Sequence, residues 1–472
     1  MAVPAKTRNL KEKQMSQTAL TENKMGIMPV GKLLTNMATP IIIAMLVQAF
    51  YNVVDSIYVS RISESAVTAM SLAFPIQNLM IGFATGLGVG VNALLSKSLG
   101  EGARERANGA AGNGVVLMLL FTAIFVLFGF VGARPFFAMQ SDVAETVDGG
   151  ASYIAICCIF SLGIFVEVLG ERLLQASGRS VYTLFTQGLG AIVNIILDPI
   201  FIFGWFGIPA MGMAGAAIAT VIGQWIAGIM AIIFNLKFNA DVKFGLSYLK
   251  PRKQIIKPIL VVGIPSVVMV AVGSVMNFGL NQILQSFKDY GETATGVFGI
   301  YFKLQSFFFM PLFGLNNAAI SLIAFNYGAR KPERITGTLK RVVVSASVIM
   351  LLGVAVFQCV PHILLQLFEP SPAFLSLGIS ALRTISLSFP MAGICIALGA
   401  SFQALGNGIY STITSLCRQL VVLLPVAYLL SLTGDVHTVW WAFPIAEVAS
   451  LTMTMIFFAR IYRQKVKPLF QM

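Results

Sequence analysis

Long hydrophobic runs recur along the chain, separated by short polar segments. Each run is long enough to cross a hydrocarbon slab of about 30 Å as an α-helix. We expect twelve spans, at residues 37–58, 68–95, 113–133, 151–173, 183–206, 212–235, 257–287, 295–325, 342–362, 376–402, 411–432 and 438–460. The pattern predicts an all-α polytopic membrane protein, in which the long second, seventh and eighth runs tilt or include a turn.

Composition supports a membrane protein. Of the 472 residues, 57% are hydrophobic and only 11% are charged, and the mean hydropathy is +0.83. The net charge of +13 does not indicate a nucleic-acid partner, because the basic residues gather in alternate connections between the runs. The opposite connections hold only Arg61, Arg134 and Lys288. By the positive-inside rule both termini are expected to be cytoplasmic, in a multi-pass protein of the cell membrane.

The chain divides at its polar segments. The expected parts are a disordered cytoplasmic tail (1–31), an N-terminal six-helix lobe (32–236), a basic cytoplasmic linker (237–256), a C-terminal six-helix lobe (257–462) and a cytoplasmic tail (463–472). All five cysteines lie inside apolar runs without metal-ligand spacing, so they indicate neither a disulfide framework nor a metal site.

The two lobes repeat one another at an offset of 228 residues. The matched pairs include Gly86 with Gly314, Gly100 with Gly328, Arg106 with Arg334, Gln175 with Gln403, and Gly178 with Gly406; Pro40 matches Pro265 at an offset of 225. Six spans in each half make the halves enter the membrane in the same sense. The repeat therefore predicts two pseudo-symmetric lobes related by an axis along the membrane normal, as in alternating-access transporters.

One carboxylate, Asp55, lies deep within the first span. It is roughly 27 Å along the helix when counted from residue 37, still inside the hydrocarbon. An ionised carboxylate there costs at least about 2.5 kcal/mol, which makes it a candidate functional residue. The structural alternative is an aspartate that is protonated or hydrogen-bonded to a neighbour such as Asn52 for packing alone.

Several motifs together resemble the multidrug and toxic compound extrusion (MATE) family. They are PIIIAMLVQAFYNVVDSIYVSRI at 40–62, GVNALLSKSLGEGARERANGA at 90–110, LLQASGRS at 173–180, NIILDPIFIF at 194–203, and the second-half echoes AFNYGARKPERITG and FQALGNG. The resemblance covers nearly the whole chain. It implies twelve helices in two lobes forming a V-shaped cleft, and export of drugs in exchange for H⁺ or Na⁺.

The resemblance also implies a site. In the DinF-like branch of that family, an Asp on the first helix and an Asn and an Asp on the fifth form a cation site, and the matching positions here are Asp55, Asn194 and Asp198. The second-half counterparts of the two acids are Leu280 and Val426, so the coupling site is expected only in the first lobe. Pro40 removes a backbone hydrogen bond near the inner end of the first helix and is the expected kink.

Other embedded polar groups are candidates for substrate contact. Glu171 is expected either to contact a cationic substrate or to pair with Arg172 or Arg179 near the membrane surface. Gln48 and Asn52 share the stretch that carries Asp55. Phe309 and Met310 belong to an aromatic and methionine-rich stretch that suits an adaptable drug-binding wall, although core or lipid-facing packing is favoured for most of it.

Glu447 matches the depth of Lys303, which favours a structural ion pair between them. Arg418 is expected to snorkel toward the cytoplasmic surface, and Trp440 and Trp441 to anchor the outer interface.

The leading hypothesis is a cation-coupled antiporter that exports amphipathic organic cations across the lipid bilayer, as a monomer without a cofactor. The coupling ion, H⁺ or Na⁺, stays open. A lipid-linked saccharide flippase of the same superfamily is the alternative, and it would favour a cavity rich in Arg and Lys. An intramembrane aspartyl protease built on Asp55 and Asp198 is disfavoured, because the sequence lacks the GxGD arrangement expected of that chemistry. The sequence also lacks a phosphate-binding loop, so it does not suggest ATP hydrolysis.

Overall fold

A computed structural model describes residues 23–288, 290–366, 368 and 371–471. Over these residues the chain is helical, with no strand. The first half contains α2 (Lys24–Ile27), α3 (Val30–Ser60), α4 (Glu64–Gly100), α5 (Arg104–Val131), α6 (Ala133–Ala138), α7 (Ala144–Ile159), α8 (Leu162–Ala176), α9 (Val181–Phe203), η1 (Trp205–Gly207) and α10 (Gly212–Phe238). A short 3-10 turn, η2 (Leu246–Leu249), lies in the linker.

The second half has the same plan. It contains α11 (Lys253–Gln285), α12 (Gly291–Gly328), α13 (Pro332–Cys359), α14 (Pro361–Gln366), α15 (Pro372–Ser386), α16 (Phe389–Ala404), α17 (Gly408–Leu416), the π-helix η3 (Cys417–Leu423), α18 (Leu424–Ser431), α19 (Val436–Val439) and α20 (Ala442–Ile461), followed by η4 (Tyr462–Val466) and η5 (Lys467–Gln471).

Membrane-spanning helices account for the predicted hydrophobic runs. Among the described residues, ten helices are long and apolar enough to cross a membrane, and there are twelve spans if two bent pairs count as one each. The pairs are α7 with α8, bent by 48°, and α15 with α16, bent by 45°. The prediction of twelve spans is thus confirmed, but the fourth and tenth spans are broken rather than continuous. The long second, seventh and eighth runs are single helices without a turn.

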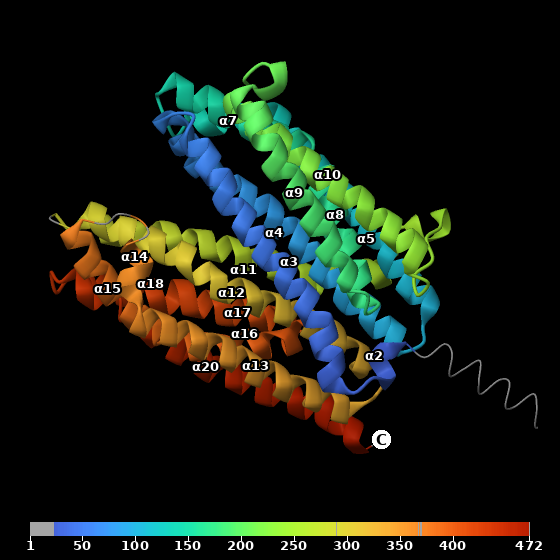
Figure 1. Ribbon diagram of the computed structural model, residues 1–472. Coiled ribbons are helices and arrows are strands. Elements are labelled where there is room, and N and C mark those ends of the chain that lie inside the picture. Colours follow the sequence, from blue (N-terminus) through green and yellow to red (C-terminus); the bar gives the residue numbers. More distant parts are fainter. Residues whose placement is uncertain (1–22, 289, 367, 369–370, 472) are drawn as a thin grey trace, which may run out of the picture.

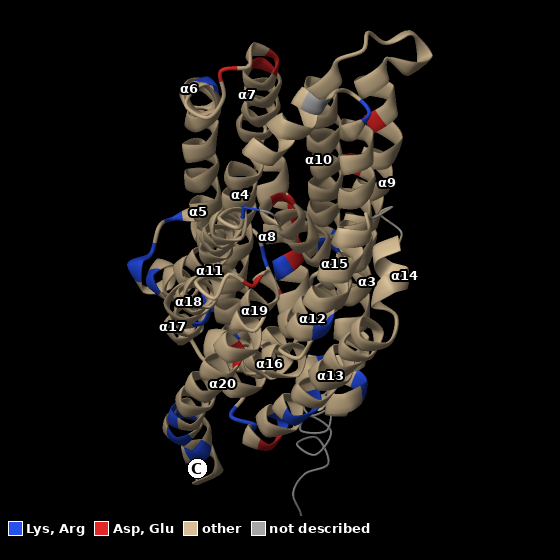
Figure 2. Ribbon diagram, turned by 90° about the vertical axis from the view of Figure 1, so that its left-hand side faces the viewer, with Lys and Arg blue, Asp and Glu red and all other residues tan. Residues whose placement is uncertain are grey.

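Two groups of helices diverge from a common end. Figure 1 shows α3–α10, in blue to green, and α11–α20, in yellow to red, meeting near α2 and spreading apart toward the opposite side. The predicted pair of six-helix lobes matches these groups. The loops near the meeting end carry most of the basic residues, and we call it the basic end. In Figure 2 the C-terminal segment is blue, whereas the loop before α7 carries acidic residues.

At the basic end, the first helix of each lobe packs in the hydrophobic core of the other lobe. Leu33, Met37 and Ile41 of α3 pack in the hydrophobic cluster of the C-terminal lobe. In the same way Ile255 and Ile259 of α11 pack in the cluster of the N-terminal lobe. Each lobe core therefore includes the part of the other lobe's first helix that lies at the basic end.

The predicted N-terminal tail is only partly described. Residues 1–22 lie outside the described residues. Residues 24–27 form α2 and Val30 begins α3, so the last part of the predicted tail is helical. The apolar residues that follow Lys24 explain this difference, because the first of them, Met25, is fully buried in the core.

Candidate cation and substrate site

The three residues predicted to bind a cation come together in the N-terminal lobe. Asp55 lies on α3, Asn194 and Asp198 lie one turn apart on α9, and these two helices pack side by side. All three side chains are buried, with 8%, 3% and 0% of their surface exposed. Asp55 and Asp198 are close enough for their charges to interact. The structure therefore brings together residues that are far apart in sequence, and their role as a cation site stays a prediction.

Unpartnered oxygen atoms mark the site. The Nδ2 atom of Asn194 donates to Oδ1 of Asp198 at 3.3 Å and to Oγ1 of Thr220 on α10 at 3.4 Å. Three buried oxygens have no hydrogen-bond partner, namely Oδ1 of Asp55, Oδ1 of Asn194 and Oδ2 of Asp198. A buried acceptor without a partner costs about 1–3 kcal/mol. A proton or a Na⁺ ion would satisfy these oxygens, because both bind hard oxygen donors.

Pro199 follows Asp198 within α9 and is itself buried. Its ring removes one backbone hydrogen bond, so the helix is weakened at the position that carries the acid. Pro40 lies within α3, where the kink was predicted, and α3 is continuous across it.

Asn52 does not support the structural alternative for Asp55. Its side chain is exposed, and no hydrogen bond joins it to Asp55. Gln48 is half-buried and hydrogen-bonds Tyr51, whose hydroxyl interacts electrostatically with both Asp55 and Asp198. Sequence reasoning missed Tyr51 and Thr220. Tyr51 lies four residues before Asp55, and that spacing could have indicated it.

Glu171 lies deeper toward the basic end and is 3% exposed. Its carboxylate accepts a hydrogen bond from Oγ1 of Thr186 at 2.6 Å and another from Nε2 of Gln187 at 2.9 Å, both on α9. The alternative of an ion pair with Arg172 or Arg179 is wrong. Arg172 donates to Gln175 at 2.8 Å, and Arg179 pairs with Asp241.

Glu447 pairs with a different residue from the one predicted. Its Oε1 atom lies 3.0 Å from Nη1 of Arg418, whereas Lys303 is exposed. Arg418 lies in the π-helix η3, whose wider turn changes the face on which each side chain lies. The expectation that Arg418 snorkels to the surface is wrong, because its guanidinium is paired with Glu447.

The aromatic candidates belong to the C-terminal lobe. Phe309 and Met310 are half-buried, and the ring of Phe309 packs edge-on against Phe389 at 5.4 Å between centroids. This is the core packing that the sequence favoured for this stretch. Trp441 is exposed, but Trp440 is fully buried, so the expected interfacial role of Trp440 is wrong.

Comparisons with known proteins agree with this fold. The MatE family model matches residues 40–200 and 265–429, one match in each half. Multidrug export protein MepA of Staphylococcus haemolyticus is 27% identical over 427 residues, covering 90% of this chain and 92% of that protein. MepA of Staphylococcus aureus (strain MRSA252) is 25% identical over 420 residues, covering 89% and 91%.

Solved structures share the whole architecture. A crystal structure of MATE in the straight conformation has a TM-score of 0.88 and 25% identity, covering 96% of this chain and 99% of that one. An outward-facing conformation of a multidrug resistance MATE family transporter also has a TM-score of 0.88, at 24% identity, and covers 96% and 99%.

A duplicated twelve-span bundle with buried carboxylates defines a polytopic membrane transporter. The family matches span more than half of the chain, one in each lobe. This chain belongs to the MatE family of efflux transporters.

Proposed function

We propose that this protein is an antiporter that exports amphipathic organic cations in exchange for H⁺ or Na⁺. The observation that carries the proposal is the set of three buried, unpartnered oxygens on Asp55, Asn194 and Asp198. Two adjacent carboxylates in a low-dielectric setting bind a cation in preference to remaining charged and unpaired. The names of the MepA relatives, which are multidrug export proteins, support the class of cargo.

Coupling follows from competition. A ligand shifts a conformational equilibrium only through its different affinity for the two states. Loading H⁺ or Na⁺ at Asp55 and Asp198 removes the negative charge that attracts a cationic drug. Gln48, Tyr51 and Glu171 extend the polar surface from the cation site along the same lobe, and they are the residues that we propose contact the cargo.

Orientation is part of the proposal. The basic end is placed in the cytoplasm, with both termini, because Lys and Arg gather there. The lobes then move relative to one another, so that the binding site opens to one side of the membrane at a time. The flippase alternative would favour a cavity lined with several bases, and the buried polar groups described above are mainly acids and amides.

Dye efflux from vesicles tests the coupling. Purified protein is reconstituted, pH and Na⁺ gradients are imposed separately, and ethidium export is followed by fluorescence. Asp55→Asn and Asp198→Asn should each reduce gradient-driven export by at least about tenfold, since each removes one ligand charge. Asp142→Asn, at an exposed loop position, is the matched control and should export normally.

The same vesicles test the cargo. A cationic dye should be exported, while an anionic analogue of similar size should stay. Wild-type export rates in both Asp55→Asn and Asp198→Asn would overturn the cation site, and equal export of the two dyes would overturn the cargo assignment.

A further inference from the structure

A short N-terminal segment lies between the lobes at the basic end. We call residues 23–28 the N-terminal strap; it contains α2 and precedes the first membrane span. Met25 is fully buried and belongs to the core of the C-terminal lobe, although the segment leads into the N-terminal lobe. Figure 1 places α2 at the end where the two groups of helices meet.

Cations from the C-terminal lobe hold the end of α2. The Nη2 atom of Arg334 donates to the carbonyl oxygens of Met25 and Met28, at 3.0 and 2.7 Å. Nζ of Lys331 donates to the carbonyl oxygen of Gly26 at 2.9 Å. The last carbonyls of a helix lack intrahelical partners and carry a partial negative charge, so these bonds are charge-assisted.

Arg334 is also held in place on its own side. Its Nε atom donates to Oδ1 of Asn326 at 2.9 Å, and Asn326 is buried near the end of α12. The guanidinium therefore joins α12, α13 and the strap. Removing it would leave the carbonyl of Met28 without this donor, and would leave the carbonyl of Met25 with only the 3.5 Å bond from Nδ2 of Asn326.

The other side of the strap is bound to the N-terminal lobe. Nδ2 of Asn23 donates to Oδ2 of Asp241 at 3.3 Å and to the carbonyl oxygen of Ser177 at 3.4 Å. Asp241 is in turn paired with Arg179. The loop between α8 and α9 and the loop between α10 and α11 thus hold the strap from one lobe. Lys331, just before α13, and Arg334, in the first turn of α13, hold it from the other lobe.

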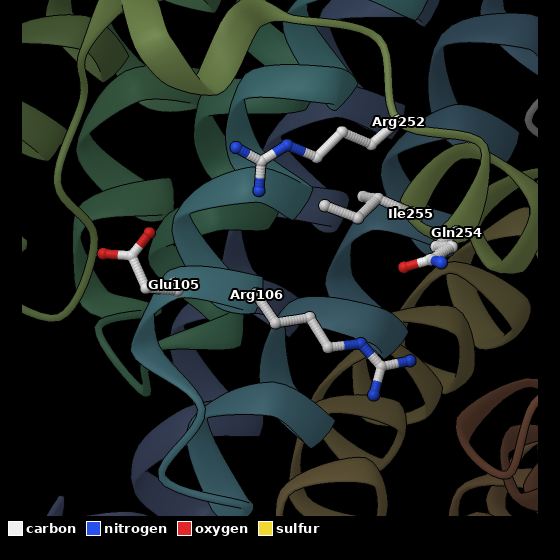
Figure 3. Close-up of a pocket in the computed structure, with 5 residues that line it drawn as sticks. All are labelled: Glu105, Arg106, Arg252, Gln254 and Ile255. Carbon is white, nitrogen blue, oxygen red and sulfur yellow. The ribbon is translucent and has the colours of Figure 1, made fainter.

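The internal repeat provides a comparison for Arg334. Its counterpart at an offset of 228 is Arg106 on α5. Nη1 of Arg106 reaches Oε2 of Glu101 at 3.4 Å and contacts no strap. Arg106 lines a pocket of about 430 Å³ with Arg252 and Gln254, and Figure 3 shows its guanidinium pointing away from the carboxylate of Glu105. Only the copy of this arginine in the second repeat is bonded to the strap.

We propose that the N-terminal strap is a latch that keeps the basic end closed and must release Arg334 and Lys331 before the lobes separate there. The inference rests on the alternating movement proposed above. When the loop between α12 and α13 moves away from Asp241 and Ser177, the strap cannot keep bonds to both sides, because hydrogen bonds are lost beyond about 3.5 Å. The strap therefore stabilises the closed basic end and adds to the barrier for opening it.

Distance measurements between spin labels test the latch without any transport assay. Arg104 and Glu333, exposed residues on opposite lobes at the basic end, are replaced by labelled cysteines in a background that lacks the five native cysteines. In Arg334→Ala the population with a widened basic end should increase at least about tenfold, because the variant loses two charge-assisted bonds to the strap and a single such bond already accounts for about a tenfold change. Arg106→Ala is the matched control and should leave the distances unchanged.

Lys331→Ala is the second variant, because it removes a single bond to the strap and leaves the bonds of Arg334 intact. It should increase the open population by a smaller factor. The latch is refuted if neither Arg334→Ala nor Lys331→Ala changes the distances while pH, Na⁺ or dye does change them in the wild type. It is equally refuted if Arg106→Ala acts as strongly as Arg334→Ala. If no ligand and no variant changes the distances, both the latch and the alternating movement are refuted.

Discussion

Alanine at Gly328 should force the lobes apart where α12 crosses α4. A Cβ atom at Gly328 would lie 2.1 Å from the carbonyl oxygen of Lys97, and one at the repeat-related Gly100 would lie 2.0 Å from the carbonyl oxygen of Phe325. Both contacts are to backbone, so no side chain can rotate away. The two glycines face each other across the pseudo-symmetric crossing at the basic end.

The size of the effect follows from the overlap. Ordinary Cβ contacts lie at 3.4–4 Å, so the helices must separate by more than about 1 Å. Overpacking of this kind typically costs about 1–3 kcal/mol. We therefore expect Gly328→Ala to lower the thermal unfolding midpoint in detergent and to widen the distance between labels at Arg104 and Glu333.

Gly188→Ala is the matched control for this substitution. Gly188 lies within α9, and a Cβ atom there would meet nothing within 4 Å. Alanine should be neutral or stabilising at this position, by up to about 1 kcal/mol, through its helix propensity. If Gly328→Ala proved as stable as Gly188→Ala and kept the wild-type label distance, the close crossing of α4 and α12 would be wrong.

Two further predictions concern charged groups. Arg418→Met should destabilise the C-terminal lobe by about 3 kcal/mol, because it leaves Glu447 buried without its partner. The double variant Arg418→Met/Glu447→Gln should recover part of this loss. Thermal unfolding of both variants checks the prediction, and no recovery in the double variant would argue against the pair. Partial burial and the charge of Arg179 lower the pKa of Lys24 in the strap, although more than a third of this residue stays exposed. The detached strap therefore binds more protons, so attachment should strengthen modestly as pH rises toward the ordinary value of 10.5. The label distances measured against pH check this second prediction, and a pH dependence that survives in Lys24→Met would contradict it.

Hydrophobic periodicity predicted the membrane spans well because each span must satisfy its own backbone hydrogen bonds in lipid. It could not show the bends in the fourth and tenth spans, which break at Phe160–Ser161 and Leu387–Ser388 without a distinctive polar interruption. Nor could it show the exchange of first helices between the lobe cores. Leu33 and Ile255 would be apolar whichever lobe they packed against, so only the tertiary structure shows which lobe core each residue joins.

The candidate site was partly predictable for a physical reason. Asp55 and Asp198 are conspicuous because carboxylates are rare in apolar helices, and the spacing of Asn194 and Asp198 places both on one face. Thr220 was not predictable, since hydroxyl side chains are common in membrane helices. The pairing of Glu447 with Arg418 was missed because depth in the membrane alone does not show which helix packs beside α20, and in the structure that helix is η3.

Competition between cation and drug is the central claim, and one equilibrium measurement tests it most directly. Binding of a cationic dye to the purified protein is titrated across pH, and across Na⁺ at fixed pH, for the wild type and for Asp55→Asn. The affinity of the wild type for the dye should fall as H⁺ or Na⁺ loads the site, and by linkage the dye should weaken cation binding by the same factor. Asp55→Asn should lose most of this dependence. A dye affinity that is indifferent to both ions in the wild type would contradict the account.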